Sequence, residues 1–270
     1  MNKKIGVIGT GNMGSAIIYG ALKSKVFTKN DILAYEINKD LQSHIEDSTG
    51  IQFTSYLKDL AHCDLIVIAV KPQDIKDLLN ILGKYINEDS LIVSIAAGVA
   101  LSSLKTHLNN KGHIIRAMPN TPVSICVGVT AICIDEKCSN IDISQVENLF
   151  NSLGTTIQIK ENMFDSISAL SGSGPAYFFY IIEALVKVAI QEGFDEKTAL
   201  KLMIQTCSGA IKLLQSTDKS PEELLQKVMS PKGSTAEAIK IFEKEHMPQI
   251  IKNAIKSAIQ RNKELGETNN

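Results

Sequence analysis

The 270-residue sequence lacks tryptophan, and its five cysteines include no CxxC pair. An odd number of cysteines without paired spacing argues against a disulfide framework or a zinc site and favours free thiols in a reducing compartment. The five histidines are scattered and form no HExxH pattern. We therefore expect no metal site and no histidine-based catalytic centre.

An excess of one charge is also missing. Lys plus Arg total 28 against 29 for Asp plus Glu, which leaves a formal net charge of -1. Nucleic-acid binding normally needs a basic face, so nucleic acid is not an expected partner. The first apolar run, in MNKKIGVIGTG, breaks into glycines too early for a signal peptide. The sequence therefore predicts a cytoplasmic protein.

Long apolar runs are scarce as well. The most apolar stretch, YFFYIIEALVKVAI at 177–190, is interrupted by Glu183 and Lys187. It falls short of the roughly 20 apolar residues that a membrane helix needs. We interpret it as a buried helix of a soluble protein and expect no membrane association.

The first half of the chain alternates short apolar runs with helical patterns. Runs without strict alternation indicate strands buried on both faces of a parallel sheet, and the βαβα order indicates a doubly wound sheet. Strands are predicted at 4–9, 31–36, 64–70, 90–98, 113–118, 127–134 and 155–159. We therefore expect an N-terminal Rossmann-type domain over residues 1–160.

After Lys160 the pattern becomes almost entirely helical. Helices are predicted at about 162–170, 175–192, 195–216, 221–229, 235–245 and 248–264. Gly193 suits a helix end, while Ser220, Pro221 and Glu223 have the order of an N-cap, a first-turn proline and a capping-box partner. The expected fold is α/β with an all-α C-terminal domain over residues 161–270.

A glycine-rich motif follows the first predicted strand. GTGNMG at 9–14 fits GxGxxG between a strand and a helix, which is the context of dinucleotide binding. Gly9 suits a tight turn, Gly11 admits a pyrophosphate near the backbone, and Gly14 permits close helix–strand packing, with the phosphates on the helix N-terminus. The alternative is a purely structural glycine turn. The predicted cofactor-binding residues here are Ile8, Gly9, Thr10, Gly11, Asn12 and Met13.

The end of the second strand bears on the type of cofactor. An acidic residue there normally accepts the ribose 2'-hydroxyl of NAD, whereas a 2'-phosphate prefers neutral or basic contacts. Glu36 therefore favours NAD, while Asn38 and Lys39 can hold the phosphate of NADP. Both cofactors remain open, with Glu36 and Asn38 as predicted contacts.

Two further strand ends are predicted to border the nicotinamide. Val70, Lys71 and Pro72 lie at the end of the third predicted strand, and Ala96 and Ala97 end the fourth with small side chains. In open α/β sheets the carboxyl ends of strands line the ligand crevice. The alternatives are a helix start with proline at its first position and close packing of small residues.

A loop near the C-terminus, VMSPKGSTAEAI at 228–239, contains no metal ligand and no pair of nucleophile and base. Its glycine and small residues run into a helical pattern, so successive backbone N–H groups and the positive helix end can hold an anion. The alternative is an ordinary helix start with Thr235 as N-cap. The glycines of SGSGP at 171–175 can let the long central helix approach the nicotinamide or the substrate. The alternative there is a helix break with Pro175 at the first helical position.

Six stretches together resemble the pyrroline-5-carboxylate reductase family. They are GVIGTGNMGSAI (6–17), AVKPQ (69–73), SIAAGV (94–99), RAMPNTP (116–122), ALSGSGPAY (169–177) and SPKGST (230–235). The resemblance implies a Rossmann domain followed by a helical dimerisation domain. It also implies hydride transfer from NADPH, or NADH, to 1-pyrroline-5-carboxylate, giving L-proline, in homodimers that often assemble into decamers.

With this resemblance the loop is interpreted as the substrate-carboxylate site. Its predicted substrate-binding residues are Ser230, Gly233, Ser234 and Thr235, and Thr235 is the predicted catalytic residue because its hydroxyl can donate to the carboxylate or the ring nitrogen. Four positions depart from the family pattern, namely Glu36, Tyr56, Asp218 and Lys232. They bear on cofactor preference and on the charge of the loop.

Two alternatives remain at this point. A β-hydroxyacid dehydrogenase shares the Rossmann-plus-helical layout but needs a catalytic lysine on the central helix, where Lys187 lies about three turns from the helix start. A regulatory paralogue would keep the dinucleotide site and lose the reaction. The intact SGSGP and SPKGST motifs argue against that second alternative.

Overall fold

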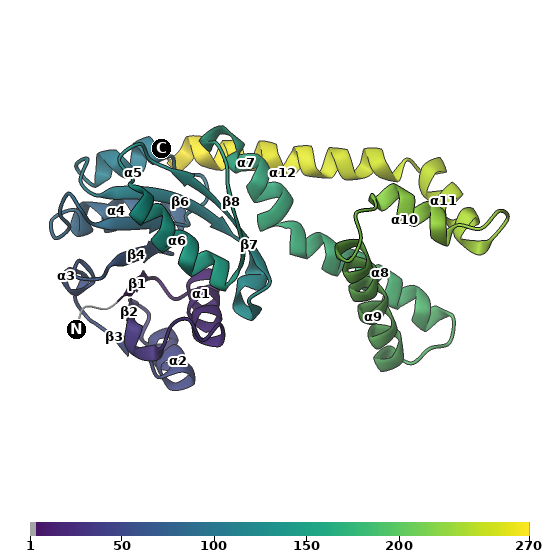
Figure 1. Cartoon of the computed structure of the whole chain (residues 1–270), viewed down its shortest axis with the longest axis horizontal. Coiled ribbons are helices and arrows are strands. Elements are labelled where there is room, and N and C mark those ends of the chain that lie inside the picture. The colour runs from purple at the N-terminus through teal and green to yellow at the C-terminus, as the bar shows by residue number, and fades with distance from the viewer. Residues whose placement is uncertain (1–3, 270) are drawn as a thin grey trace. The chain divides into compact units, whose positions relative to one another are not determined.

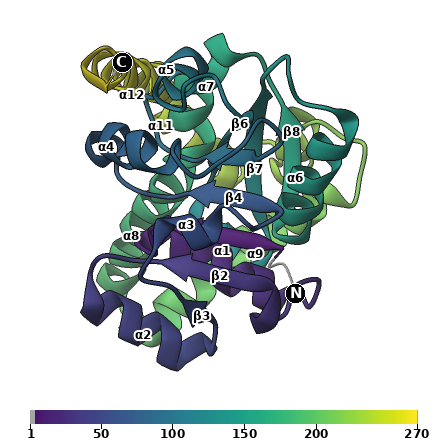
Figure 2. The same cartoon turned by 90° about the vertical axis from the view of Figure 1, so that its left-hand side faces the viewer.

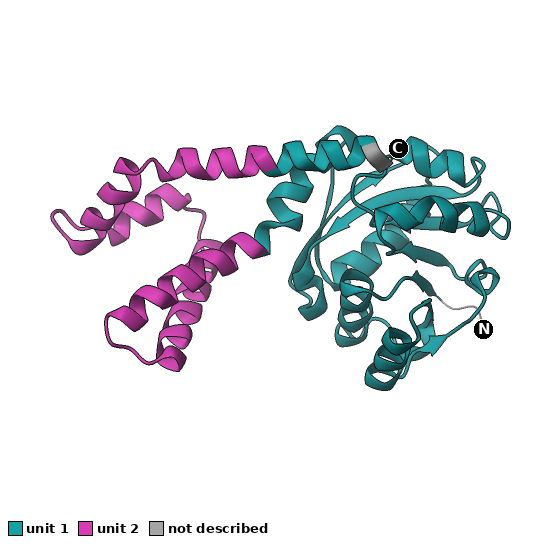
Figure 3. Cartoon of the chain, turned by 180° about the vertical axis from the view of Figure 1, so that it is seen from behind, with its two compact units in different colours: residues 1–175, 258–270 teal, residues 176–257 magenta. Residues whose placement is uncertain are grey.

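The structure, a computed structural model, describes residues 4–269 and contains two compact units. Unit 1 comprises the chain up to Pro175 together with the residues from Ala258 onward, and unit 2 comprises Ala176–Ser257 (Figure 3). The boundary lies beyond Lys160 because the segment after β8 packs on the sheet. Phe164, for example, is buried in the core of unit 1.

Unit 1 is built on a single sheet. Within residues 4–269 the strands form an 8-stranded sheet of order β3-β2-β1-β4-β5-β6-β7-β8 (Figures 1 and 2). The strands are β1 (Ile5–Ile8), β2 (Ile32–Tyr35), β3 (Gln52–Phe53), β4 (Leu65–Ile68), β5 (Leu91–Ser94), β6 (His113–Pro119), β7 (Gly128–Ile134) and β8 (Gly154–Gln158). This arrangement confirms the predicted α/β class.

Helices cover both faces of the sheet. The α-helices of unit 1 are α1 (Asn12–Lys23), α2 (Lys39–Thr49), α3 (Leu57–Leu60), α4 (Pro72–Leu82), α5 (Leu101–His107), α6 (Asn140–Ser152) and α7 (Phe164–Ile167). Short 3-10 turns occur at Lys29–Asp31, Thr121–Ile125 and Glu161–Met163. One apolar core lies between the sheet and α1, α2 and α6, and the other between the sheet and α3, α4 and α5.

The central strands are apolar throughout because both of their faces are covered. All four residues of β1, β4 and β5 are buried, and each pairs in parallel with its neighbours. The antiparallel pairing of β6 with β7 departs from a fully parallel sheet. Only a 3-10 turn, Thr121–Ile125, connects these two strands, and a parallel crossover needs a longer connection.

Unit 2 is helical, as predicted. It contains most of α8 (Gly174–Gln191), α9 (Glu196–Gln215), α10 (Pro221–Val228), α11 (Ser234–Lys244) and the first part of α12 (Met247–Asn269). The predicted capping box is present, since Ser220 Oγ accepts from Glu223 N at 3.2 Å and Ser220 N donates to Glu223 Oε2 at 2.7 Å. Gly193 follows α8 with φ +97°, a conformation that favours glycine.

The interpretation of 177–190 as a buried helix is wrong for the single chain. Phe178, Phe179 and Tyr180 on α8 are 61%, 66% and 76% exposed. Among the described residues, the run 161–191 is long and apolar enough to cross a membrane by length and composition, with 11% of its apolar window buried. The other segments of unit 2 leave these apolar side chains of α8 exposed.

Candidate functional site

The glycine loop joins β1 to α1 with almost no free space around two of its glycines. Gly9 has φ +88°, and a Cβ there would lie 2.8 Å from Ala69 O. A Cβ on Gly14 would lie 2.1 Å from Gly9 O, so this position cannot carry a side chain without moving the backbone. Around Gly11, by contrast, a Cβ meets nothing within 4 Å. The loop is therefore tight against the protein and open at Gly11.

The N-terminus of α1 is free to bind an anion. Its N-cap is Gly11, which has no side chain that could cap the helix, and no acidic residue lies in the first turn. The first N–H groups of a helix have no partner within the helix. Ile8 and Thr10 are buried beneath the loop, whereas Gly11 and Asn12 are exposed. This combination of an uncapped helix start and an open glycine fits the pyrophosphate of a dinucleotide.

Glu36 lies at the carboxyl end of β2, beside the glycine loop. Its Oε2 accepts hydrogen bonds from Thr10 N at 2.7 Å and from Thr10 Oγ1 at 3.1 Å. Its Oε1 accepts from Asn38 N at 3.0 Å. Asn38 Oδ1 in turn caps α2 by accepting from Asp40 N and Leu41 N. The two residues predicted to contact the cofactor ribose thus have fixed positions.

The other predicted cofactor residues also lie at the carboxyl ends of strands in unit 1. Val70 follows β4 by two residues, Lys71 is the N-cap of α4, and Pro72 is the first residue of that helix. Ala96 is buried and Ala97 exposed just after β5. Pro72 and Ala97 both line a cavity of about 260 Å³, together with Arg116, Met118, Phe164 and Ser168 among others.

Two residues of the RAMPNTP motif have structural roles that the sequence did not reveal. Arg116, on β6, donates from Nη1 to Glu161 Oε1 at 2.7 Å, and its guanidinium lies 4.2 Å from the centroid of the Phe164 ring. Asn120 donates to Ser171 O at 3.3 Å and accepts from Val129 N at 2.9 Å. Asn120 therefore connects this motif to SGSGP.

SGSGP does not form the helix break that was considered for it. Residues Ser168–Gly172 form a π-helical turn, and α8 begins at Gly174, so Pro175 is its second residue. A Cβ on Gly172 would lie 3.8 Å from Met118 Sδ, which is ordinary contact distance. The motif is thus a locally widened helix lying close to the end of β6.

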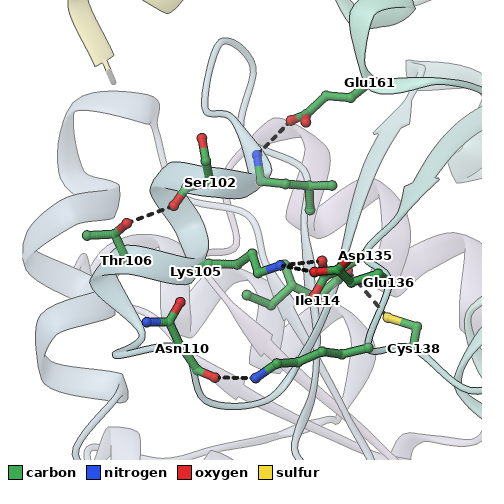
Figure 4. Close-up of polar contacts among 11 residues, drawn as sticks. Ser102, Lys105, Thr106, Asn110, Ile114, Asp135, Glu136, Cys138 and Glu161 are labelled. Carbon is green, nitrogen blue, oxygen red and sulfur yellow. Dashed lines mark hydrogen bonds and ion pairs between the residues drawn. The ribbon is translucent and has the colours of Figure 1, made fainter.

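Polar contacts fix α5 against unit 1. Glu161 Oε1 accepts from Leu101 N at 2.6 Å, and Lys105 Nζ donates to Asp135 Oδ1 at 2.6 Å (Figure 4). The hydrogen bond to Asp135 raises the pKa of Lys105 above its ordinary value.

Cys138 contacts Ile114 O, and burial raises the pKa of its thiol to about 11, so the thiol is protonated at neutral pH.

The predicted substrate loop lies in unit 2 and leads into α11. The N-cap of α11 is Gly233, with no side-chain capping bond, so the alternative of Thr235 as N-cap is wrong. Gly233 N donates to Ser230 O at 3.0 Å, and a Cβ on Gly233 would lie 2.3 Å from Ser230 Oγ. Ser230 and Ser234 are exposed and Thr235 is half-buried. The first N–H groups of α11 are therefore available to an anion.

Lys232 adopts a left-handed conformation in this loop, with φ +62°. Glycine adopts such a conformation without strain, whereas other L-residues lose about 1–2 kcal/mol. The backbone thus has the shape that a glycine would favour at this position, and the lysine side chain is exposed.

The helical part of the chain matches a known family model. Residues 161–265 match the model described as pyrroline-5-carboxylate reductase dimerisation. Residues 4–98 match the model described as NADP oxidoreductase, coenzyme F420-dependent. The first match begins where the sequence pattern becomes helical, and the second covers the glycine loop and the ends of β2 and β4.

Relatives that match nearly the whole chain are also pyrroline-5-carboxylate reductases. The chain is 35% identical over 267 residues to a pyrroline-5-carboxylate reductase of Methanosarcina acetivorans, covering 98% of this chain and 99% of the relative. A Plasmodium falciparum pyrroline carboxylate reductase structure with NADP bound has a TM-score of 0.90 at 30% identity, covering 98% of each chain. A Coxiella burnetii pyrroline-5-carboxylate reductase structure has a TM-score of 0.89 at 34% identity, covering 98% of this chain and 99% of the other.

Proposed function

The chain belongs to the pyrroline-5-carboxylate reductase family, and from this membership we propose that it reduces 1-pyrroline-5-carboxylate to L-proline. When bound, NADPH or NADH supplies the hydride. Neither alternative is favoured by a feature of the structure. Lys187, the lysine that a β-hydroxyacid dehydrogenase would need, forms an exposed ion pair with Glu183 at 2.8 Å.

Within unit 1, the chain's role is to hold the dinucleotide. Gly11, Asn12 and Met13 bring the start of α1 to the pyrophosphate, and Glu36 and Asn38 stand at the adenosine ribose. Val70, Lys71, Pro72, Ala96 and Ala97 border the nicotinamide, because they follow neighbouring strands at the crevice edge of the sheet. Fixing the cofactor in this way limits its motion before transfer.

The observation that supports a carboxylate site most directly is the uncapped start of α11 at Gly233. The substrate has a carboxylate, which the first N–H groups of a helix and the helix dipole can hold. Ser230, Gly233 and Ser234 shape this site. In this proposal the Thr235 hydroxyl donates a hydrogen bond to the carboxylate or toward the ring nitrogen. A protonated imine then accepts hydride without a metal.

A direct assay separates this function from its alternatives. Purified protein is mixed with 1-pyrroline-5-carboxylate and either NADPH or NADH, and the loss of absorbance at the nicotinamide band is followed. We expect turnover with at least one of the two cofactors. Cofactor binding without any oxidation would indicate a regulatory paralogue. Oxidoreduction with β-hydroxyacids alone would indicate the dehydrogenase.

Thr235→Ala tests the role of the loop. We expect kcat/KM for 1-pyrroline-5-carboxylate to fall by about 10- to 100-fold, because one charge-assisted hydrogen bond is lost, while the Kd of the cofactor is unchanged. Thr155→Ala, at an exposed position of β8 in unit 1, is the matched control and leaves both values unchanged. An equal loss of substrate use and cofactor binding would mean that the loop is only structural.

The family model supports homo-oligomerisation through residues 161–265. We propose that residues 161–270 act as the substrate-binding and dimerisation domain, that the homodimer is the basic unit and that dimers assemble into decamers. The exposed apolar side chains of α8 then meet a second copy of the chain instead of a lipid. Consistent with this, α8 carries the Glu183–Lys187 ion pair within its apolar stretch. We further propose a cytoplasmic location.

A further inference from the structure

The carboxylate of Glu36, just after β2, is held by several hydrogen bonds. Three hydrogen bonds from two loops converge on its carboxylate, two from Thr10 and one from Asn38 N. Thr10 is fully buried, and Gly9 N donates to Tyr35 O at 2.9 Å, so the donor loop is itself fixed to β2. The carboxylate therefore cannot turn away without leaving a buried donor unpaired.

The carboxylate of Glu36 can accept one more hydrogen bond, and a hydroxyl group can donate it. Two carboxylate oxygens offer about four acceptor positions, and three are used here. A ribose 2'-hydroxyl can donate to the fourth. A 2'-phosphate has oxygens that accept hydrogen bonds, and it carries a charge of about -1.5 to -2 at neutral pH. The fixed negative charge of Glu36 would therefore repel it.

Among residues 4–269, no lysine or arginine forms an ion pair with the Glu36 carboxylate. Lys39, the nearest lysine in sequence, donates from Nζ to Gln42 Oε1 at 3.0 Å on α2. The side-chain oxygen of Asn38 already accepts the hydrogen bonds that cap α2.

We infer that Glu36 determines the cofactor preference of this chain, by accepting the free 2'-hydroxyl of NADH and opposing the 2'-phosphate of NADPH. The inference rests on the proposed function only in that both require a dinucleotide at the glycine loop. It concerns this chain alone, since the Plasmodium falciparum structure at 30% identity is described with NADP bound.

The test is direct binding of NADH and NADPH to the wild-type protein by titration calorimetry, supported by KM for each cofactor. We expect the Kd of NADPH to exceed that of NADH by about tenfold or more, because an opposing fixed charge discriminates against the wrong ligand. Glu36→Gln keeps an acceptor for Thr10 N and removes the charge. It is expected to reduce the NADPH/NADH ratio of Kd values by about tenfold.

Two further variants make the result specific to Glu36. Glu46→Gln removes the same charge from an exposed position on α2 and is expected to leave the ratio unchanged. Lys84→Gln, which removes an exposed positive charge outside the predicted cofactor site, is also expected to leave it unchanged. Tighter binding of NADPH than NADH by the wild-type protein, or an unchanged ratio in Glu36→Gln protein with a wild-type melting temperature, would overturn the inference.

Failure of the inference is distinguishable from failure of the proposed function. Calorimetry with the two dinucleotides needs no substrate and no turnover, so the preference is measured even in a protein that does not reduce 1-pyrroline-5-carboxylate. Conversely, a reductase that oxidises NADPH more efficiently than NADH would contradict only the role of Glu36.

Discussion

The glycines of the GTGNMG loop differ in the space around them. At Gly14 a side chain would collide with Gly9 O, whereas Gly11 faces open space. The same motif thus contains one glycine that the protein needs for its own packing and one that borders open space, where we propose that the pyrophosphate binds. Substitutions at the two positions separate these roles.

We expect Gly14→Ala to lower the free energy of unfolding by about 2 kcal/mol, because the added methyl overpacks a rigid backbone contact. Gly11→Ala is the matched control for stability and is expected to leave it almost unchanged. Gly11→Ala should nevertheless raise the Kd of the dinucleotide about tenfold or more, because its methyl occupies the space that the pyrophosphate requires. Denaturant unfolding and calorimetry measure the two effects. Loss of stability in Gly11→Ala would contradict this separation.

At the scale of elements, the start of α6 is anchored by a charged cap. Asp142 accepts from Ser139 N and Ser139 Oγ, each at 2.7 Å, and lies 2.8 Å from His113 Nδ1 on β6. Burial acts to raise the pKa of Asp142, but the hydrogen bonds from Ser139 and the contact with His113 outweigh it, so the pKa lies below its ordinary value. The ionised carboxylate is thus part of the folded state.

Because this pKa is lower in the folded than in the unfolded chain, its stabilisation is complete above about pH 4 and is lost as the pH falls through the folded-state pKa. We expect Asp142→Asn to lower the free energy of unfolding by about 2 kcal/mol at pH 7, and by progressively less below pH 4. Urea unfolding at a series of pH values measures this dependence. Asp89→Asn, at an exposed position, is the control. Equal losses at every pH would exclude the ionic explanation.

The longer elements could be predicted from the sequence because each carries a strong pattern. The strands at β1, β4 and β5 are continuous apolar runs, and α10 has its capping box. The two-residue strand β3 has no detectable pattern, and its pairing with β2 is set by the tertiary fold. The start of α11 at Gly233 depends on a backbone turn closed by Ser230 O, which residue types alone do not specify.

The site residues differ in how far sequence alone could assign them. The glycine loop was predictable because each glycine has a separate steric reason. The hydrogen bonds that Glu36 receives from Thr10 join residues that are distant in sequence, so only the folded sheet brings them together. Arg116 and Asn120 were missed as structural residues for the same reason, since their partners Glu161 and Ser171 lie far along the chain.

At the scale of the whole molecule, the helical unit lacks a core of its own. Within Ala176–Ser257, all of which the structure describes, Ala189 and Ala199 are the buried residues. Large apolar side chains remain exposed on α8, α9, α11 and α12. A patch of this kind on a soluble protein marks an interaction surface. The burial predicted for α8 therefore requires contact with a second chain. The sequence of one chain does not show such a contact.

We expect Phe179→Glu to convert the homo-oligomer to a smaller species or a monomer, because it places a charge in an apolar interface. Size-exclusion chromatography with light scattering measures the mass. Tyr85→Glu, at a half-exposed aromatic position of unit 1, is the control and should retain the wild-type mass. An unchanged mass in the Phe179→Glu protein would exclude α8 from the interface.

The most direct test of the central claim is the amount of L-proline formed per nicotinamide oxidised when the wild-type protein acts on 1-pyrroline-5-carboxylate. Reduction of the C=N bond by one hydride predicts one L-proline for each NADH or NADPH consumed. Oxidation of the nicotinamide without L-proline, or no oxidation with either cofactor, would contradict the proposed reaction.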